Sequence, residues 1–382
     1  MQAVTYQGLK NVQVKDVPDA TLKENDDILV QITSTAICGS DLHLFHGMMP
    51  NLQENYIIGH EPMGIVVETG TDVTKVKKGD RVVIPFNVSC GECYFCKHQL
   101  ESQCDNSNQN GEAGAYLGFS GTFGGYPGGQ AELLRVPYGN FTPFVIPKDC
   151  ELEDEKLLFL SDIMPTAYWS VENAGVKAGD TVIVLGCGPV GLLTQKFAWM
   201  KGAARVIAVD HIQYRLEHAK KTNNVEIFNF TEVENLGEHL REITGGGADV
   251  VIDCVGSTAK ASLLESIETA LKIQGGSMSA IVIASQAVRK GGTIGLVGLY
   301  GSRYNAFPLG DLFARNITLK MGQAPVIHYM PELYEKLANG SFDPTDIITH
   351  RLPLSEAKHG YQVFDGKMEN CIKVVLKPQL LH

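Results

Sequence analysis

The first part of the chain is built from short runs in which apolar and polar residues alternate. Two examples are residues 28–32 and 64–68, each too short for a helix of ordinary length. A period of two predicts strands that bury one face, and glycines between such runs are typical of turns. We therefore predict a mainly β region from residue 2 to about residue 157.

The pattern changes at about residue 161, where apolar strand-like runs begin to alternate with helical ones. The first strand-like run is 181–185, and the series continues through helix-like 192–201, strand-like 205–209, helix-like 213–221, strand-like 249–253, a helical stretch near 263–273 and strand-like 293–297. This alternation predicts a doubly wound parallel sheet. The chain ends in an alternating strand, 372–376, which we expect to pair within the first domain. The predicted domains are 1–157, an inserted nucleotide-binding domain 158–302, and a return to the first domain over 303–382.

A glycine-rich turn follows the strand-like run 181–185 and opens a helix. Its glycines are Gly186, Gly188 and Gly191, and Asp210 ends the next strand. Glycines at these positions allow a tight turn, close approach of a pyrophosphate and close packing of helix on strand. An acid at the next strand end accepts hydrogen bonds from ribose hydroxyls and repels a 2′-phosphate, which favours NAD over NADP, although His211 beside it weakens that preference. The alternative is a glycine turn that binds no ligand.

Four cysteines, Cys90, Cys93, Cys96 and Cys104, have the spacing C-x2-C-x2-C-x7-C. Four thiolates close together can surround one tetrahedral zinc and leave no open position, which predicts a structural site. The long final spacing argues against an iron–sulfur cluster. The surroundings are not basic, which argues against a nucleic-acid zinc ribbon.

A second group of possible ligands is spread along the chain. Cys38 is followed closely by Ser40, Asp41 and His43, and His60 stands 22 residues further on, next to Glu61. From the residues alone, a buried thiol, a core histidine and a capping aspartate explain these positions as well as a metal site does.

These motifs together resemble those of the zinc-dependent medium-chain alcohol dehydrogenases. Residues 38–43, residues 59–61, the four-cysteine lobe and the turn 186–191 occur in the order of that family, and the resemblance covers essentially the whole chain. It implies an α/β fold in which a chaperonin-10-like, mainly β catalytic domain is interrupted by a doubly wound parallel Rossmann domain. It also implies two zinc ions per chain, one catalytic and one structural, with NAD as the coenzyme.

Within the family, residues 161–168 and 322–326 look most like the glutathione-independent formaldehyde dehydrogenase branch. That branch places an aspartate at the third ligand position, so the resemblance assigns Cys38, His60 and Asp162 to the catalytic zinc. Three protein ligands leave one position open for substrate. The alternative for Asp162 is an N-cap of the helix near residue 165.

The resemblance assigns catalytic roles to Ser40, His43 and Glu61. The Ser40 hydroxyl takes the substrate proton and passes it through the nicotinamide ribose toward His43, which exchanges it with solvent near its own pKa. Glu61 is a neighbour or transient ligand of the zinc, and Asp41 orients His60. The alternatives are a local cap for Ser40, a satisfied surface imidazole for His43 and a solvated carboxylate for Glu61.

Four further residues are matched to the coenzyme by resemblance. Val190 and Arg215 correspond to positions that hold the pyrophosphate and the adenosine ribose, and Val297 and Gly322 to stretches near the nicotinamide half. The alternative for Arg215 is a charged residue on an exposed helix face, which explains it equally well. Phe86 lines the pocket by analogy or simply fills the core.

Composition and net charge limit the classes of partner that the chain is expected to bind. The chain has 382 residues, 44% of them hydrophobic, and a net charge of −11, which disfavours nucleic acid and anionic membrane surfaces. No run is long enough to span a membrane and the first residues lack a secretory pattern, so we expect a cytoplasmic protein with reduced thiols. By resemblance, we expect a homo-oligomer, either a dimer or a tetramer.

The predicted function is the transfer of a hydride from an alcohol or a hydrated aldehyde, with formaldehyde one candidate, to NAD. Alternatives are a polyol or amino-alcohol dehydrogenase of the same family, a catalytically silent nucleotide-binding protein and a zinc-ribbon interaction module. The sequence leaves open whether two segments, 121–129 and 257–280, cover the active site or make subunit contacts.

Overall fold

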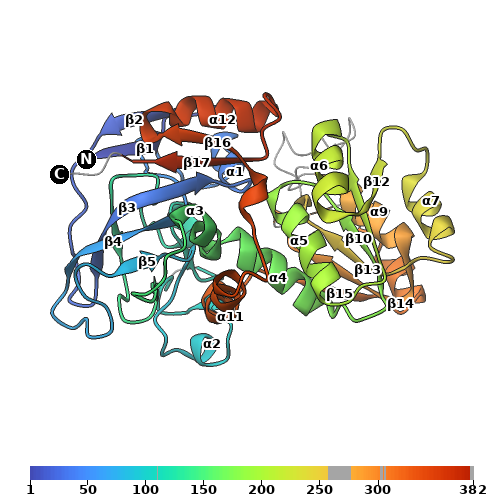
Figure 1. Cartoon of the computed structure of the whole chain (residues 1–382), viewed down its shortest axis with the longest axis horizontal. Coiled ribbons are helices and arrows are strands. Elements are labelled where there is room, and N and C mark those ends of the chain that lie inside the picture. The colour runs from blue at the N-terminus through green and yellow to red at the C-terminus, as the bar shows by residue number, and fades with distance from the viewer. Residues whose placement is uncertain (110, 257–276, 302–303, 305–306, 379–382) are drawn as a thin grey trace. The chain divides into compact units, whose positions relative to one another are not determined.

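A computed structural model describes residues 1–109, 111–256, 277–301, 304 and 307–378. The chain packs as two compact units (Figure 1). The first comprises Met1–Pro165 and Pro325–His382, and the second comprises Thr166–Ala324. Over the described ranges, no helix combines the length and the apolar character needed to cross a lipid bilayer.

A seven-stranded sheet forms the centre of the first unit. Its order is β16-β17-β3-β4-β5-β9, with β8 also paired to β3. The long strand β3 pairs antiparallel with both β4 and β17, so it lies between them. The strands are β3 (Ile28–Ile37), β4 (Glu61–Thr69), β5 (Arg81–Val83), β8 (Leu133–Val136), β9 (Phe144–Val145), β16 (Ile348–Pro353) and β17 (Lys373–Lys377).

Smaller elements complete this unit. Its two short ribbons are β1 (Gln2–Tyr6) with β2 (Val12–Asp16), and β6 (Asn87–Val88) with β7 (Ala115–Tyr116). Its helices are α1 (Asp41–Phe45), α2 (Tyr94–Lys97), α3 (Asp154–Leu157), α11 (Val326–Ala338) and α12 (Ala357–Gly366), with 3-10 turns η1 (Glu101–Gln103), η2 (Gly121–Phe123), η3 (Leu158–Ser161), η5 (Thr345–Ile347) and η6 (Leu354–Glu356). Aliphatic side chains from β3, β4, β5 and β8 form one buried core cluster, and their removal from water stabilises this sheet.

The second unit is built on a six-stranded parallel sheet of order β12-β11-β10-β13-β14-β15. This order reverses between β10 and β13, as in a doubly wound fold. The strands are β10 (Thr181–Leu185), β11 (Arg205–Asp210), β12 (Glu226–Asn229), β13 (Ala248–Asp253), β14 (Val288–Leu296) and β15 (Thr318–Met321). The helices are α4 (Ile163–Ala174), which begins in the first unit, α5 (Pro189–Met200), α6 (Gln213–Asn223), α7 (Leu236–Ile243), α9 (Ser279–Ala287) and α10 (Leu309–Ala314).

The sequence pattern predicted this architecture in outline. The mainly β unit, the parallel unit and the return of the last strand to the first unit are confirmed, since β17 pairs with β3. The packing limits differ from the expected 157 and 302. The second unit runs to Ala324 because β15 extends the parallel sheet beyond β14, and η3 packs on the first unit's strands. The helical stretch expected near 263–273 lies outside the described residues.

Candidate functional site

The ends of three neighbouring strands in the first unit place reactive side chains at one edge of the sheet. Because β3 is antiparallel to both neighbours, its carboxyl end lies beside the amino ends of β4 and β17. Cys38 directly follows β3, Glu61 begins β4 and Lys373 begins β17. Residues remote in the sequence therefore meet at this edge.

Four buried side chains converge there: Cys38, His60, Glu61 and Asp162. One ligand atom from each lies within 4.8 Å of the others. Asp162, at the junction of η3 and α4, places its Oδ2 3.3 Å from the Cys38 sulfur and 3.2 Å from His60 Nε2. The structure thus brings together the three predicted ligands of the catalytic zinc.

Asp41 orients the His60 ring. Its Oδ1 lies 3.0 Å from His60 Nδ1, while its Oδ2 accepts the Cys38 backbone N–H at 2.9 Å and the Gln130 amide at 3.2 Å. A proton on Nδ1, shared with Asp41, leaves the lone pair of Nε2 toward Cys38 and Asp162. The Ser40 hydroxyl lies 2.9 Å from the same Nε2, so it too borders the group.

The donor set suits a zinc ion. Burial, with the nearby carboxylates of Asp162 and Glu61, raises the pKa of the Cys38 thiol to about 11. Burial lowers the pKa of His60, but Asp41 and Asp162 outweigh it and leave that pKa well above its ordinary value. Ionising Cys38 to a thiolate beside the Asp162 carboxylate in this apolar interior therefore calls for a compensating cation. Zinc prefers this combination of sulfur, nitrogen and oxygen.

Glu61 forms a fully buried ion pair with Lys373. The ammonium donates to Glu61 Oε1 at 2.7 Å, and neither side chain has any exposed surface. Burial lowers the pKa of Lys373, but Glu61 and Cys38 more than offset this and raise it overall. Glu61 Oε2 has no hydrogen-bond partner among the described residues. The interpretation of Glu61 as a solvated surface carboxylate is therefore wrong, because its side chain is enclosed.

Lys373 is the member of this site that sequence reasoning missed. It stands as a single charge in the apolar run 372–376, and an isolated lysine in an otherwise buried strand is the signal that could have found it. Gln130, which links Asp41 to the hydroxyl of Tyr361 (2.9 Å to its Oε1), was missed for a different reason. Nothing in its local sequence points to the site.

His43 lies on α1 and is buried, with 7% of its surface exposed. Burial, and then His46, lowers its pKa to about 4. The expectation that His43 exchanges protons with solvent near its ordinary pKa, and its alternative as a surface imidazole, both need correction. The enclosed ring favours the neutral form at pH 7.

Aromatic rings flank His60 on one side. Phe86 and Phe119 meet its ring nearly edge-on, with centroids 6.3 and 6.0 Å away. Tyr116 packs against both of them and stacks on Phe123 at 4.9 Å. The start of the glycine-rich loop 121–129 thus packs on side chains that adjoin the buried group.

The four cysteines of the lobe also converge. Sulfur–sulfur distances are 3.5 Å for Cys93 and Cys96, and 3.9 Å both for Cys90 with Cys96 and for Cys93 with Cys104. Tetrahedral zinc with bonds of 2.3 Å requires sulfur separations of about 3.8 Å. A hydrogen bond from Cys96 lowers the pKa of Cys104 to about 4. The geometry therefore fits one zinc held by four thiolates.

In the second unit, the glycine turn after β10 is tightly packed. A side chain on Gly191 would place its Cβ 1.9 Å from the Gly186 carbonyl oxygen, and Gly186 has a positive φ of 96°. Gly188 precedes α5, and Arg215 Nη1 lies 3.7 Å from the position that a Cβ would take on Gly188. The turn thus leaves backbone N–H groups accessible at a helix start, beside a guanidinium.

Asp210 ends β11 and fastens this turn. Its Oδ2 accepts the Cys187 backbone N–H at 2.7 Å, and its Oδ1 accepts those of His211 and Ile212 at 2.6 and 3.0 Å. Burial raises the pKa of Asp210, but the His211 side chain, the Cys187 N–H bond and Arg215 outweigh it, so the pKa falls below its ordinary value. Asp210 is therefore negatively charged, with part of its hydrogen-bonding capacity already used.

The other predicted coenzyme residues lie at the same edge of the parallel sheet. Val190 is in the first turn of α5, Val297 follows β14 and Gly322 follows β15. Carboxyl ends of parallel strands are where ligands bind in doubly wound folds. The positions agree with the predicted roles, which remain predictions.

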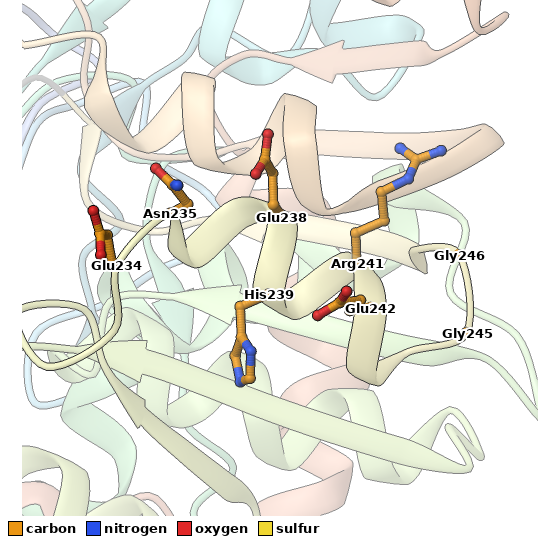
Figure 2. A pocket seen from close by; sticks show the side chains of 8 residues that line it. All are labelled: Glu234, Asn235, Glu238, His239, Arg241, Glu242, Gly245 and Gly246. Atoms are coloured by element: carbon orange, nitrogen blue, oxygen red, sulfur yellow. The ribbon is translucent and has the colours of Figure 1, made fainter.

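A surface pocket of about 600 Å³ lies elsewhere in the second unit, beside α7 (Figure 2). Its wall includes Gly245 and Gly246, which lead into the amino end of β13, at the edge opposite the glycine turn. The remaining lining residues are Glu234, Asn235, Glu238, His239, Arg241 and Glu242. None of these residues belongs to the predicted site.

Known proteins resemble the chain over its whole length. Residues 24–148 match the alcohol dehydrogenase GroES-like domain, and residues 189–280 match the zinc-binding dehydrogenase family. An uncharacterized zinc-type alcohol dehydrogenase-like protein of Bacillus subtilis is 67% identical over 99% of this chain and 100% of its own length.

Two further relatives carry names that describe an activity. A glutathione-independent formaldehyde dehydrogenase of the same organism is 34% identical over 95% of this chain and 94% of its own. The solved structure of an alcohol dehydrogenase from Thermus sp. ATN1 superimposes with a TM-score of 0.85 and 33% identity, over 99% of this chain and 100% of that one. The expected chaperonin-10-like and Rossmann domains are thereby confirmed, and the chain belongs to the zinc-type alcohol dehydrogenases, a family of oxidoreductases.

Proposed function

We propose that this protein is a two-zinc dehydrogenase that passes a hydride from a small alcohol or a hydrated aldehyde to NAD. The observation that carries the proposal is the convergence of Cys38, His60 and Asp162, whose ligand atoms meet in a buried group although Cys38 and Asp162 are 124 residues apart. Formaldehyde hydrate is the first substrate to test, since one relative is named for formaldehyde.

These three residues would hold the catalytic zinc, with Glu61 within reach, and the four-cysteine lobe would hold a structural one. When bound, the catalytic zinc acts as a Lewis acid that lowers the pKa of a substrate hydroxyl. The Lys373 ammonium offsets the charge of Glu61, so that the group does not collect more negative charge than one cation can balance.

Ser40 is the proposed first acceptor of the substrate proton, because its hydroxyl borders the group at His60 Nε2. His43 receives the proton next. Its depressed pKa of about 4 keeps the imidazole neutral at pH 7 and makes it a weak base, so the protonated ring would be only a short-lived carrier of the proton. Asp41 keeps the His60 ring in one tautomer throughout.

NAD is favoured as coenzyme by the charge on Asp210. A carboxylate at the end of the second parallel strand accepts a ribose hydroxyl and repels a 2′-phosphate. Arg215, 3.7 Å from the Cβ position of Gly188, places a positive charge beside the expected pyrophosphate site. The glycine turn itself supplies the N–H donors.

The aromatic side of the group favours a small substrate. Phe86 and Phe119 present carbon toward His60, and a polyol chain placed there would lose hydrogen bonds to water without replacing them. A one- or two-carbon alcohol carries no further hydroxyl, and formaldehyde hydrate carries only one beyond the hydroxyl that is activated.

The test combines metal analysis with a substrate screen. We expect two zinc ions per chain, and turnover of formaldehyde and short alcohols with NAD at least tenfold faster than turnover of sorbitol or threonine. One zinc or none in a fully active preparation would overturn the zinc mechanism, and a preference for polyols would overturn the substrate class. Comparing NAD with NADP in the same screen tests the role of Asp210.

We further propose that the protein is a cytoplasmic homo-oligomer, either a dimer or a tetramer, as the family resemblance implies. Light scattering on the purified chain tests the assembly, and fractionation of the host cell tests the location.

A further inference from the structure

Asp253 is a buried acid at the coenzyme edge that none of the proposed steps uses. It is the last residue of β13, the strand next to β10 at the point where the sheet order reverses. Its side chain has no exposed surface. A carboxylate taken fully out of water needs compensating hydrogen bonds, so its partners show what it is for.

Asp253 fastens two loops at once. Its Oδ1 accepts the backbone N–H groups of Val255 and Gly256, at 2.8 and 3.2 Å, within its own turn. Its Oδ2 accepts the Tyr300 hydroxyl at 2.5 Å. Its backbone carbonyl accepts the N–H of Val297 at 3.0 Å, so the segment 297–300 after β14 is attached at both ends.

The backbones of these two loops are in close contact. A Cβ on Gly298 would lie 2.1 Å from the Gly256 nitrogen, so no larger residue fits between them. The first loop also touches the glycine turn, because Val255 Cγ2 lies 2.8 Å from the Cβ position of Gly186. Asp253 therefore connects the turn after β10 with the segment after β14.

The two loops belong to the second half of the doubly wound sheet. In such a sheet the coenzyme lies across the carboxyl edge, with the first half, β10 and β11, binding one nucleotide and the second half, β13 and β14, facing the other. A loop fixed before binding loses less entropy when the ligand arrives. The hydrogen bond to a carboxylate is of the stronger kind, which suits this purpose.

We propose that Asp253 and Tyr300 are positioning residues, which hold the segment 297–300 in the arrangement that receives the nicotinamide half of the coenzyme. This inference rests on the proposed function, because it assumes that a nicotinamide coenzyme binds at this edge. It assigns no contact with the coenzyme to either side chain. Their effect passes through the backbone that they hold.

Paired affinities for NADH and ADP-ribose test the proposal. ADP-ribose keeps both phosphates and riboses but lacks the nicotinamide ring. In Tyr300→Phe we expect the Kd of NADH to rise about tenfold, because one hydrogen bond to a charged group is lost. The Kd of ADP-ribose should change by no more than about twofold. Tyr94→Phe removes the hydroxyl of a tyrosine in the other unit that is 64% exposed, and we expect it to change neither Kd.

Asp253→Asn is the second variant, because it keeps the size of the side chain while removing its charge. We expect the same selective loss, together with a raised KM for NAD and a smaller change in kcat. Equal weakening of NADH and ADP-ribose in both variants, or no change in either, would overturn the positioning role. Failure of the proposed function would be seen in the unaltered chain, which would then bind no NADH at all. Failure of the positioning role alone would be seen only in the variants.

Discussion

The two groups of candidate metal ligands in the first unit differ in how the chain assembles them. The four lobe cysteines lie within 15 residues, and their spacing alone brings the sulfurs together. Cys38 and Asp162 are 124 residues apart and meet only because β3 and the η3–α4 junction reach the same place. A local site needs only a loop, whereas a remote site needs the whole sheet.

Their surroundings differ in the same way. Sulfurs of the lobe accept backbone N–H groups at 3.3 Å, such as Cys90 Sγ from Cys93, so the loop itself compensates the thiolates. The remote group is enclosed and depends on Asp41 and Lys373 for orientation and charge balance. Changes in the sheet should therefore damage the remote group and spare the lobe.

Removing Asp162 should produce the largest effect. We expect Asp162→Ala to lower kcat/KM at least about 10³-fold, equivalent to about 4 kcal/mol, because the substrate hydroxyl is no longer activated. Zinc content should fall from two per chain to one, with the lobe still loaded. Elemental analysis and steady-state kinetics measure both. Full activity with only one zinc would contradict the assignment.

Replacing Lys373 tests the charge balance of the remote group. Lys373→Met leaves Glu61 buried without a partner, and we expect the free energy of unfolding to fall by about 3–5 kcal/mol. Adding Glu61→Gln to Lys373→Met should restore most of the lost free energy of unfolding. Lys377→Met, on the same strand but 48% exposed, is the matched control and should cost less than about 1 kcal/mol. Urea unfolding measures all four chains, and a double variant no more stable than Lys373→Met would refute the pairing.

Removing a lobe cysteine should destabilise the chain without abolishing its chemistry. For Cys104→Ser we expect the loss of one zinc and of about 3 kcal/mol of stability, with kcat retained in the folded fraction. Cys150→Ser, outside both groups, should change neither zinc content nor stability by a comparable amount. Loss of both zinc ions in Cys104→Ser would show that the two sites are not independent.

The smallest expected effect concerns the pH dependence of stability through His43. Its folded-state pKa, about 4, lies below the ordinary value of 6.5, so the unfolded chain binds the proton more tightly. Stability is therefore complete above pH 6.5 and decreases as the pH falls toward 4. At pH 5 the loss amounts to about 2 kcal/mol. His43→Asn should lack this part of the decrease between pH 7.5 and 5, and identical pH profiles for the two chains would contradict the buried neutral form.

The glycine turn and the four-cysteine lobe could be predicted from the sequence because each carries its own spacing, whereas Cys38, His60 and Asp162 were assigned by family resemblance. Gly186, Gly188 and Gly191 predicted a turn that the packing of Gly191 on Gly186 now explains. Lys373 shows as a lone charge in an apolar strand, but its pairing with Glu61 depends on strand pairing that no local pattern encodes, and Gln130 carries no local signal at all.

The limits of the packing units differ from the expected domain limits for a related reason. The strand β15 is short and half-polar, so its residues carry no strong strand signal, and only its pairing with β14 places it in the second unit. Glu61 was left open between a neighbour of the zinc and a solvated surface residue because a charged side chain is rarely buried, and its partner lies 312 residues away.

The place of β17 in the central sheet has a consequence for biosynthesis. Lys373 emerges from the ribosome 336 residues after Ile37, which at bacterial or eukaryotic elongation rates takes roughly 20 to 70 s. Throughout that interval the nascent first unit lacks both its last strand and the ammonium that neutralises Glu61. The four lobe cysteines, within 15 residues of one another, can meet early in translation, whereas the remote cluster lacks its balancing charge until Lys373 has been synthesised.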